Sequence, residues 1–362
     1  MIEFIKNNIN WREILSSETY YINIKDDGEF TLLKYSQIDS DFNIEIVREC
    51  RGLIIDKSLD PVCVPFYKFG NYGEPYADKI DWATAEAEEK IDGSLIKVWC
   101  CKGEWIVSTN GTIYASKANI GSDSDGSKIL AENAYNNFGE LFEAAASKAG
   151  LDFSCLDQRY TYMFELVSPY NKVVVPYRDI DIYHIGTRDN VTLEELDINI
   201  NIKKPKIYKF NNRLEDLIKM ASELKYCEEG YVIKDAAYRR IKVKSPAYVA
   251  VSSLISGMNE KKLLELLRTN EVGEFLTYFP EYQPDINILK EKLEAFAQYL
   301  DHIIEEKITQ VNYESRKDFA EMAVQTKYPA FFFNYYDNKI KTTKEWIWSL
   351  SNDKIIEHLE RL

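Results

Sequence analysis

The sequence predicts an α+β protein in which a domain of antiparallel sheets is followed by an all-helical C-terminal domain. Three observations predict this fold class. The chain of 362 residues exceeds the length that one hydrophobic core usually organises. Short strand-like segments separated by turn residues dominate the first part of the chain, and helical periodicity replaces them beyond about residue 250. We therefore expect one domain over residues 1–250 and a second over residues 251–362.

Alternating apolar segments between turn residues fill the first domain, and neighbouring segments of this kind imply antiparallel hairpins. We expect strands at residues 20–24, 30–35, 51–56, 61–69, 94–101, 104–108, 160–167, 172–177, 181–187, 230–235 and 241–245. Helices are expected over 128–148, closed by Gly150, and near 214–224. A further helix is expected after Thr192, with Glu195 as its capping-box partner.

Apolar residues of the second domain recur at helical spacing. The longest such segment covers residues 286–308, and its periodic positions predict one buried face. These positions are Leu289, Leu293, Phe296, Leu300, Ile303 and Ile304. Further helices are expected over 261–270, 315–325, 344–350 and 354–362. Trp346 and Trp348 are expected in the core of a helix rather than stacked on bases.

Composition restricts the class of protein. Apolar residues make up 45% of the chain, which excludes a disordered one. The formal net charge of −14 argues against a protein that coats nucleic acid nonspecifically, because such binding needs dense Lys and Arg. No run of eighteen apolar residues and no export signal are seen. We expect a cytoplasmic monomer that does not enter the membrane, in a cell or, if phage-encoded, in its host.

The segment Lys90–Ser94 reads Lys-Ile-Asp-Gly-Ser and precedes the alternating residues Leu95, Lys97 and Trp99. It matches the Lys-x-Asp-Gly signature of covalent nucleotidyltransferases. A lysine attacks phosphorus only as the neutral amine, and its ordinary pKa is about 10.4, so neighbouring cations or desolvation must lower it. By itself the segment is better explained as a charged turn that begins a hairpin, because four-letter patterns arise by chance.

Three further signals follow along the chain. Glu165 lies in an apolar strand, where a buried acid needs a partner or a function, although a glutamate on an edge strand facing water explains it equally well. Glu229 precedes a glycine and a strand, and a hairpin turn would explain it too. Lys242 and Lys244 are separated by one residue, so on a strand both point to one face. Such a pair is usually only a solvated strand face, but here it would hold phosphate oxygens and lower the pKa of a third lysine.

In this order the four signals resemble the ATP-dependent RNA ligases of the phage T4 RNA ligase 1 type, in the covalent nucleotidyltransferase superfamily that includes DNA ligases and capping enzymes. The upstream segments 49–53 and 65–69, and Pro169 and Asn171 after Glu165, strengthen the resemblance. It covers about the first 250 residues and implies an antiparallel-sheet nucleotidyltransferase (ATP-grasp-like ligase) domain. Where close relatives have Lys-Phe-Phe-Asn, this chain has Gly70 as the third residue, and Asn110 stands where some relatives have a basic residue.

The resemblance implies a role for each matching residue. Lys90 is the nucleophile that forms lysyl-AMP, and Asp92 and Gly93 shape the turn that positions it. Glu165 holds the ribose hydroxyls of adenosine. Val232 packs against adenine.

The remaining roles concern phosphate and metal. The resemblance implies that Glu229 places a metal ion, expected to be Mg²⁺, near the α-phosphate of ATP. Lys242 and Lys244 contact the α-phosphate. Arg51 and Lys68 bind the outer phosphates.

The expected reaction joins 5′-phosphate and 3′-hydroxyl RNA ends through lysyl-AMP and RNA-adenylate. The family suggests broken tRNA as the substrate, the helical domain as its reader and an end-healing kinase or phosphatase as a partner. A DNA ligase or a capping enzyme is an alternative, although both usually carry an OB-fold after the first domain. A nucleotide- or RNA-binding module without catalysis is another. The segment 121–128 resembles a phosphate-binding loop, but its order of Ser and Lys is reversed and an acidic surface loop explains it better.

Overall fold

The computed structural model describes residues 1–120, 135–255, 258–269, 272–309, 313 and 315–360. These residues form two compact units, the first comprising described residues up to 255 and the second those from 258 onward. The expected boundary after residue 250 falls inside helix α6 (Pro246–Ile255), which belongs to the first unit. The segment 121–128 and the first part of the helix expected over 128–148 lie outside the described residues.

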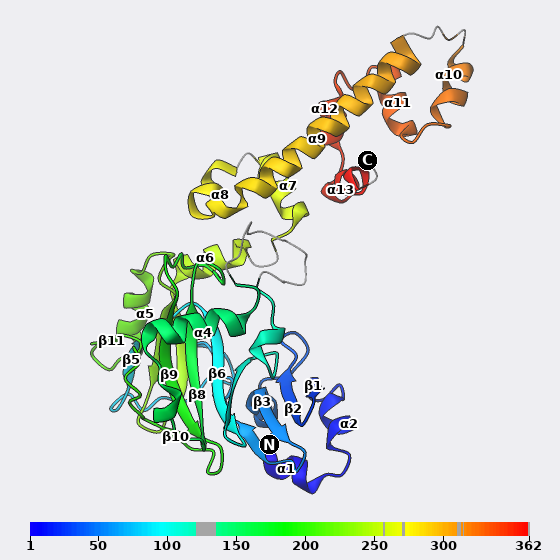
Figure 1. The fold of residues 1–362 in the computed structure, drawn as a ribbon. Coiled ribbons are helices and arrows are strands. Elements are labelled where there is room, and N and C mark those ends of the chain that lie inside the picture. Colours follow the sequence, from blue (N-terminus) through cyan, green and yellow to red (C-terminus); the bar gives the residue numbers. More distant parts are fainter. Residues whose placement is uncertain (121–134, 256–257, 270–271, 310–312, 314, 361–362) are drawn as a thin grey trace. The chain divides into compact units, whose positions relative to one another are not determined.

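Mixed α and β structure, with antiparallel sheets first and helices at the C-terminus, confirms the predicted class (Figure 1). The first sheet has the order β1-β2-β3-β4, with β1 at Ile22–Asp27, β2 at Phe30–Tyr35, β3 at Arg51–Asp56 and β4 at Pro61–Cys63. Helices α1 (Ile2–Asn7), α2 (Trp11–Ser16) and α3 (Glu45–Glu49) were not predicted. Their apolar residues share a core with Leu33, Leu53 and Ile55 of the sheet.

The central sheet has the order β10-β9-β8-β6-β7, all antiparallel. Its strands are β6 (Ser94–Cys101), β7 (Glu104–Thr109), β8 (Tyr160–Val167), β9 (Asp181–Asp189) and β10 (Glu195–Leu196). Helix α4 (Phe138–Ala149) covers one face through Leu141, Phe142 and Ala145. Trp99 on the opposite face packs with Phe30 and Ile54 of the first sheet. Strand β6 is therefore buried on both sides.

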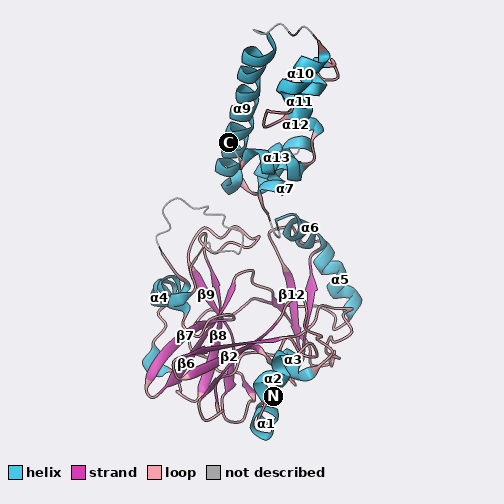
Figure 2. Cartoon of the chain, turned by 90° about the vertical axis from the view of Figure 1, so that its right-hand side faces the viewer, coloured by secondary structure: helices cyan, strands magenta, loops and turns pink. Residues whose placement is uncertain are grey.

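The third sheet has the order β11-β5-β12-β13, with β5 at Glu86–Glu89, β11 at Ile207–Tyr208, β12 at Gly230–Lys234 and β13 at Arg240–Lys244. Alternation divides its two faces. Tyr231, Ile233, Ile241 and Val243 pack against helix α5 (Leu214–Ser222). The alternate side chains of β12 and β13 point to the other face, and this face carries the candidate site. Figure 2 shows β12 separate from the central strands.

Two predicted elements of the first unit are wrong. Residues 172–177 form no strand, because the backbone N–H groups of Val174 and Val175 donate to the Asp92 carboxylate instead of a ladder. No helix follows Thr192, because the Asp189 carboxylate accepts hydrogen bonds from the backbone N–H groups of Val191 and Thr192 and forms a turn. In each case a side chain took backbone donors that the predicted element needs.

The strand expected over 61–69 is confirmed only for Pro61–Cys63. Beyond it, the backbone N–H of Val64 donates to the Thr161 hydroxyl and that of Phe66 to the Met163 sulfur. Side chains of β8 thus replace a neighbouring strand. The short strands β5 and β11 were not predicted, since neither shows an alternating apolar pattern of sufficient length.

The second unit contains α7 (Glu260–Thr269), α8 (Val272–Tyr278), α9 (Gln283–Ile304), α10 (Arg316–Ala323), α11 (Pro329–Tyr336), α12 (Thr343–Ser349) and α13 (Asn352–Leu359). The buried face predicted on α9 is confirmed, with Leu289, Phe296 and Leu300 in its core. Trp346 is buried there as predicted, whereas Trp348 is 37% exposed. Helix α11 was missed because its residues are apolar without amphipathic spacing. No helix of the described residues has the length and apolarity needed to cross a bilayer.

Gly150 ends α4 in a left-handed conformation, with φ +74°. Replacing it with Ala should lower the free energy of unfolding by about 1–2 kcal/mol, because a Cβ disfavours this conformation. Urea denaturation would measure the loss. Gly150→Asn is the matched control and should lose less, since asparagine tolerates this conformation; equal losses for the two variants would contradict the account.

Candidate active site

Lys90 lies between the third sheet and the central sheet, directly after β5 and four residues before β6 begins. Its backbone N–H donates to the Gly230 carbonyl at 2.9 Å, which fixes it beside the start of β12. Its Nζ lies 2.7 Å from Oε2 of Glu229 and is partly exposed. The amine is therefore held by its own backbone and by one carboxylate.

Glu229 is the centre of an ion-pair network. Its side chain is only 4% exposed. One carboxylate oxygen pairs with Lys90, and the other lies 2.9 Å from Nζ of Lys244. Because a buried carboxylate is unfavourable without partners, the two lysines and Glu229 stabilise one another in this arrangement. The third sheet thus brings together Lys90 and Glu229, which are 139 positions apart in the sequence.

The register of β12 and β13 places the expected ligand groups on one face. Val232 pairs with Lys242, and Gly230 pairs with Lys244. Lys242 and Lys244 therefore both point toward Lys90, on the face opposite α5. Burial first, and neighbouring cations second, together lower the pKa of Lys242 to about 7. These cations are Arg51, Lys90, Lys68 and Lys244.

Glu165 comes from β8 and faces this cluster. Oε1 accepts a hydrogen bond from the backbone N–H of Gly93 at 3.2 Å. Burial raises the pKa of Glu165 to about 7, partly offset by the nearby Lys90 ammonium. Gly93 has no room for a side chain, because an added Cβ would overlap the Leu166 carbonyl. The glycine allows β6 to approach β8 at the point where Glu165 enters the site.

Asp92 is 5% exposed and is fully engaged with the protein. Oδ2 accepts from the backbone N–H groups of Val174 at 2.9 Å and Val175 at 2.7 Å. Oδ1 accepts from the Tyr248 hydroxyl at 2.8 Å. Asp92 therefore ties the turn after Lys90 to the segment after β8 and to helix α6. This geometry makes it a residue that shapes the site.

Arg51 and Lys68 extend the cationic cluster. The Arg51 guanidinium lies 5.6 Å from the centre of the Phe69 ring, and Nζ of Lys242 lies 4.8 Å from the same ring. Nζ of Lys68 lies 4.1 Å from the Phe42 ring. Burial lowers the pKa of Lys68, and Arg51 adds to this effect. Aromatic faces, which attract cations, thus hold the like-charged groups close together.

The presence of Gly70, where close relatives have a phenylalanine, has a structural reason. A Cβ at this position would lie 3.0 Å from Cα of Ala77. The Gly70 carbonyl accepts a hydrogen bond from the backbone N–H of Lys242 at 3.0 Å, and Tyr72 donates to the Lys242 carbonyl at 2.8 Å. The segment 70–72 therefore docks along β13. Asn110, the other departure, has a buried Oδ1 that accepts no hydrogen bond from the described residues.

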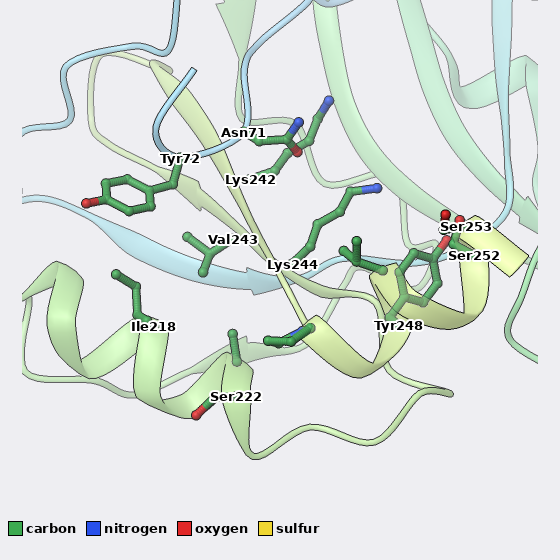
Figure 3. Close-up of a pocket in the computed structure, with 13 residues that line it drawn as sticks. Asn71, Tyr72, Ile218, Ser222, Lys242, Val243, Lys244, Tyr248, Ser252 and Ser253 are labelled. Atoms are coloured by element: carbon green, nitrogen blue, oxygen red, sulfur yellow. The ribbon is translucent and has the colours of Figure 1, made fainter. Parts of the chain in front are cut away.

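A groove of about 640 Å³ opens along β13 and gives access to the lysine pair. It lies between β13, α5, the start of α6 and segment 71–72. Figure 3 shows Lys242 and Lys244 rising from the strand, with Asn71 near Lys242 and Ile218 and Ser222 contributed by α5. Oδ1 of Asn71 is buried and accepts no hydrogen bond from the described residues, so it is available to a donor on a ligand.

The structure brings together all ten residues that the sequence singled out: Arg51, Lys68, Lys90, Asp92, Gly93, Glu165, Glu229, Val232, Lys242 and Lys244. Such clustering of cations in a chain of net charge −14 focuses positive potential on one place.

Comparison with known proteins identifies the family. Residues 49–248 match the sequence model of an RNA ligase family of the T4 type 1. The chain belongs to this RNA ligase family. A baculovirus protein, from Autographa californica nuclear polyhedrosis virus and named as a bifunctional polynucleotide kinase/RNA ligase, is 30% identical over 73% of this chain and 40% of its own. An RNA ligase of Rhodothermus phage RM378 is 25% identical over 74% of each chain.

This RNA ligase family member thus spans less than half of the baculovirus protein's length. A solved mutant RNA ligase of Naegleria gruberi, with ATP and Mn, covers 47% of this chain and 52% of its own, at 16% identity and a TM-score of 0.35. The matched residues 49–248 contain every residue of the candidate site.

Sequence reasoning missed several supporting residues. Tyr248 bonds Asp92 and lies with its ring 5.4 Å from Nζ of Lys244. Phe69 links Arg51 to Lys242. The signal for Tyr248 was available, since Pro246 begins a helix directly after the lysine pair and places the tyrosine in its first turn. Phe69 lies in the segment 65–69 that strengthened the family resemblance, but no role was expected of it.

The raised pKa of Glu165, about 7 against an ordinary value of about 4.3, makes stability fall as pH rises through this range. In the unfolded chain the carboxyl ionises at lower pH, so unfolding becomes more favourable between roughly pH 4.3 and 7. Glu165→Gln should therefore raise the thermal unfolding midpoint at pH 8 but leave it near that of the wild type at pH 4. Glu104→Gln, an exposed change on β7, is the control and should shift neither. An equal shift at both pH values would contradict the assignment.

Proposed function

We propose that the protein is an ATP-dependent RNA ligase that joins 5′-phosphate and 3′-hydroxyl ends. The observation that carries this proposal is the network of Lys90, Glu229 and Lys244, surrounded by further cations on one face of the third sheet. Family membership supports the same reaction. The first unit is then an adenylyltransferase domain with the nucleotidyltransferase, ATP-grasp-like architecture.

In this proposal adenosine binds between the third sheet and the central sheet. Val232 packs against adenine from β12, beside Lys242 in the register. Glu165 accepts hydrogen bonds from the ribose hydroxyls, and its partial exposure within the cluster suits a group that meets a ligand. Buried polar atoms aimed at a site need partners, and a nucleoside supplies them.

The cations match the charge of a triphosphate. Lys242 and Lys244 contact the α-phosphate, whereas Arg51 and Lys68 bind the outer phosphates. Like-charged groups that crowd a small space repel one another, so a polyanion stabilises the whole cluster when it binds. None of these four residues except Lys244 forms an ion pair among the described residues, which leaves three of the charges available.

The reaction has three substitutions at phosphorus. Nζ of Lys90 attacks the α-phosphorus of ATP, the N–P bond forms and pyrophosphate leaves. An oxygen of the RNA 5′-phosphate then attacks the same phosphorus and breaks the N–P bond. The RNA 3′-hydroxyl finally attacks the 5′-phosphate, and AMP leaves. Each step needs positioning and stabilisation of negative charge more than it needs an acid–base dyad.

A divalent metal ion, expected to be Mg²⁺, would neutralise part of the phosphate charge when bound with ATP. The described residues contain no group of three or more His, Cys, Asp or Glu able to hold an ion alone. Mg²⁺ commonly binds through one or two carboxylates and the substrate's phosphates, and Glu229, with Glu165 nearby, fits this requirement. To bind the metal ion, the Glu229 carboxylate would give up its ion pair with one of the two lysines, Lys90 or Lys244.

We propose the helical second unit as the reader of the RNA, with broken tRNA as the substrate. The baculovirus relative is named for a kinase together with a ligase, so a kinase or phosphatase that heals the ends is the proposed partner. A DNA ligase or a capping enzyme is less well supported, because helices rather than an OB-fold of strands follow the first unit. A binding module without catalysis would not need two partly exposed lysines paired with the buried Glu229 carboxylate.

Incubation with α-labelled ATP or GTP tests the proposal. We expect covalent label from ATP alone, because Lys90 is the only proposed nucleophile, and we expect Lys90→Ala to abolish it. Lys234→Ala, on the same face of β12 but paired with Glu88, is the matched control and should label normally. Label from GTP would indicate a capping enzyme, and no label from either nucleotide would indicate a binding module.

Removing Lys244 should slow adenylylation and move its pH dependence upward. With Lys244→Met, Glu229 keeps only Lys90 as a partner and one cation is lost from the cluster, so the amine gives up its proton less readily. Single-turnover adenylylation measured from pH 6 to 10 would show the shift. Lys234→Met should leave the profile in place. A Lys244→Met profile that coincides with that of the wild type would refute this role.

A further inference from the structure

Lys97 is a buried lysine whose function nothing above assigns. It lies on β6, in the sheet interior, and its side chain is 0% exposed. Its Nζ donates a hydrogen bond to the Gly52 carbonyl. A fully buried lysine is rare, because removing an ammonium from water is costly unless it is paired. The position therefore calls for a reason other than packing.

The ammonium has no acidic partner. Among the described residues no carboxylate forms an ion pair with Lys97, and its electrostatic neighbours are the Cys63 thiol and two further cations, Arg51 and Lys34. Burial lowers the pKa of Lys97, and Arg51 and Lys34 lower it further. Burial likewise lowers the pKa of Lys34. The Gly52 carbonyl is thus the polar group that holds Lys97 in this basic environment.

The bond to Gly52 acts on Arg51 through the backbone. The β2–β3 register shifts at this point, so that Leu33 pairs with Leu53 but Lys34 pairs with Arg51, which leaves Gly52 as the extra residue of a bulge. Gly52 has φ +82°. A bulge with a glycine of positive φ redirects the side chains beside it. The bulge thus decides where Arg51 points.

Gly52 also makes room for Lys97. A Cβ on Gly52 would lie 2.9 Å from Nζ of Lys97 and 2.8 Å from the Asn110 carbonyl oxygen. The glycine, the Lys97 amine and the Asn110 carbonyl therefore meet at the bulge. Arg51 therefore has two neighbouring supports, the Phe69 ring and, through its neighbour Gly52, the hydrogen bond from Lys97.

We propose that Lys97 is a positioning residue that holds the Gly52 bulge and thereby directs Arg51 at the outer phosphates of ATP. This inference rests on the proposed ligase function. Lys97 has no exposed surface, so it acts through the Gly52 backbone and Arg51 rather than by touching the nucleotide. The outer phosphates leave with pyrophosphate, so only the first step of ligation depends on Lys97.

The proposal makes an unusual prediction about stability. Replacing a buried, unpaired charge with an apolar side chain of similar length is often neutral or stabilising. We therefore expect Lys97→Met to keep or raise the thermal unfolding midpoint while it weakens the use of ATP. Interaction energies between residues in contact commonly correspond to a change of about tenfold in a binding constant. We therefore expect Lys97→Met to raise the KM for ATP by about this factor.

The experiment compares two reactions of the full chain. Lys97→Met should raise the KM for ATP in adenylylation and leave sealing of a pre-adenylylated RNA unchanged, because that substrate has no outer phosphates. In a double-mutant cycle with Arg51→Gln, the double variant should be no worse than Arg51→Gln alone. Cys63→Ala is the matched control, since it alters the same buried pocket and retains the ammonium.

The outcomes separate the two proposals. If the wild type takes no label from ATP, the ligase function fails. If the wild type is active but Lys97→Met has an unchanged KM for ATP, or its effect adds fully to that of Arg51→Gln, the role of Lys97 fails alone. A Lys97→Met variant with a lowered unfolding midpoint and equal loss of both reactions would reveal a structural residue and would overturn the inference.

Discussion

The rest of the site depends on one interaction, the double ion pair of the Glu229 carboxylate with Lys90 and Lys244. Glu229 is buried, and its two oxygens connect the residue after β5 to the end of β13. Without the carboxylate, Lys90, Lys242 and Lys244 would face one another with little to offset their repulsion. The third sheet therefore does more than support the site, because its register decides that the three lysines share one face.

The charged forms of several titratable side chains in the first unit are less favourable in the folded protein than in water. Burial raises the pKa of Glu165 and lowers those of Lys242, Lys68 and Lys97. Each shift means that folding disfavours the charged form. Packing of apolar residues between the central sheet, α4 and the first sheet offsets these costs. Such a cluster of shifted pKa values in one region is typical of a functional site.

Glycines and aromatic rings bring the charged groups within reach of one another. Gly93 lies against the Leu166 carbonyl of β8, and Gly70 lies against the backbone of Ala77, at distances that leave little or no room for a side chain. Phe69 receives Arg51 and Lys242 on its ring. Asp92, fixed by two backbone donors and Tyr248, joins the Lys90 turn to α6. These contacts hold the site in one arrangement before any ligand binds.

The sequence by itself determined the main strands, the helical character of the second unit and the residues of the site, because alternation and short motifs are local properties. Only the tertiary structure decided where side chains displaced secondary structure, as Asp92 does for residues 172–177 and Asp189 does after Thr192. It also decided that Lys97, which alternates like any strand residue, is a buried cation behind Arg51. The physical reason is that burial and charge neighbours arise from contacts between segments far apart in the chain, and periodicity carries no record of them.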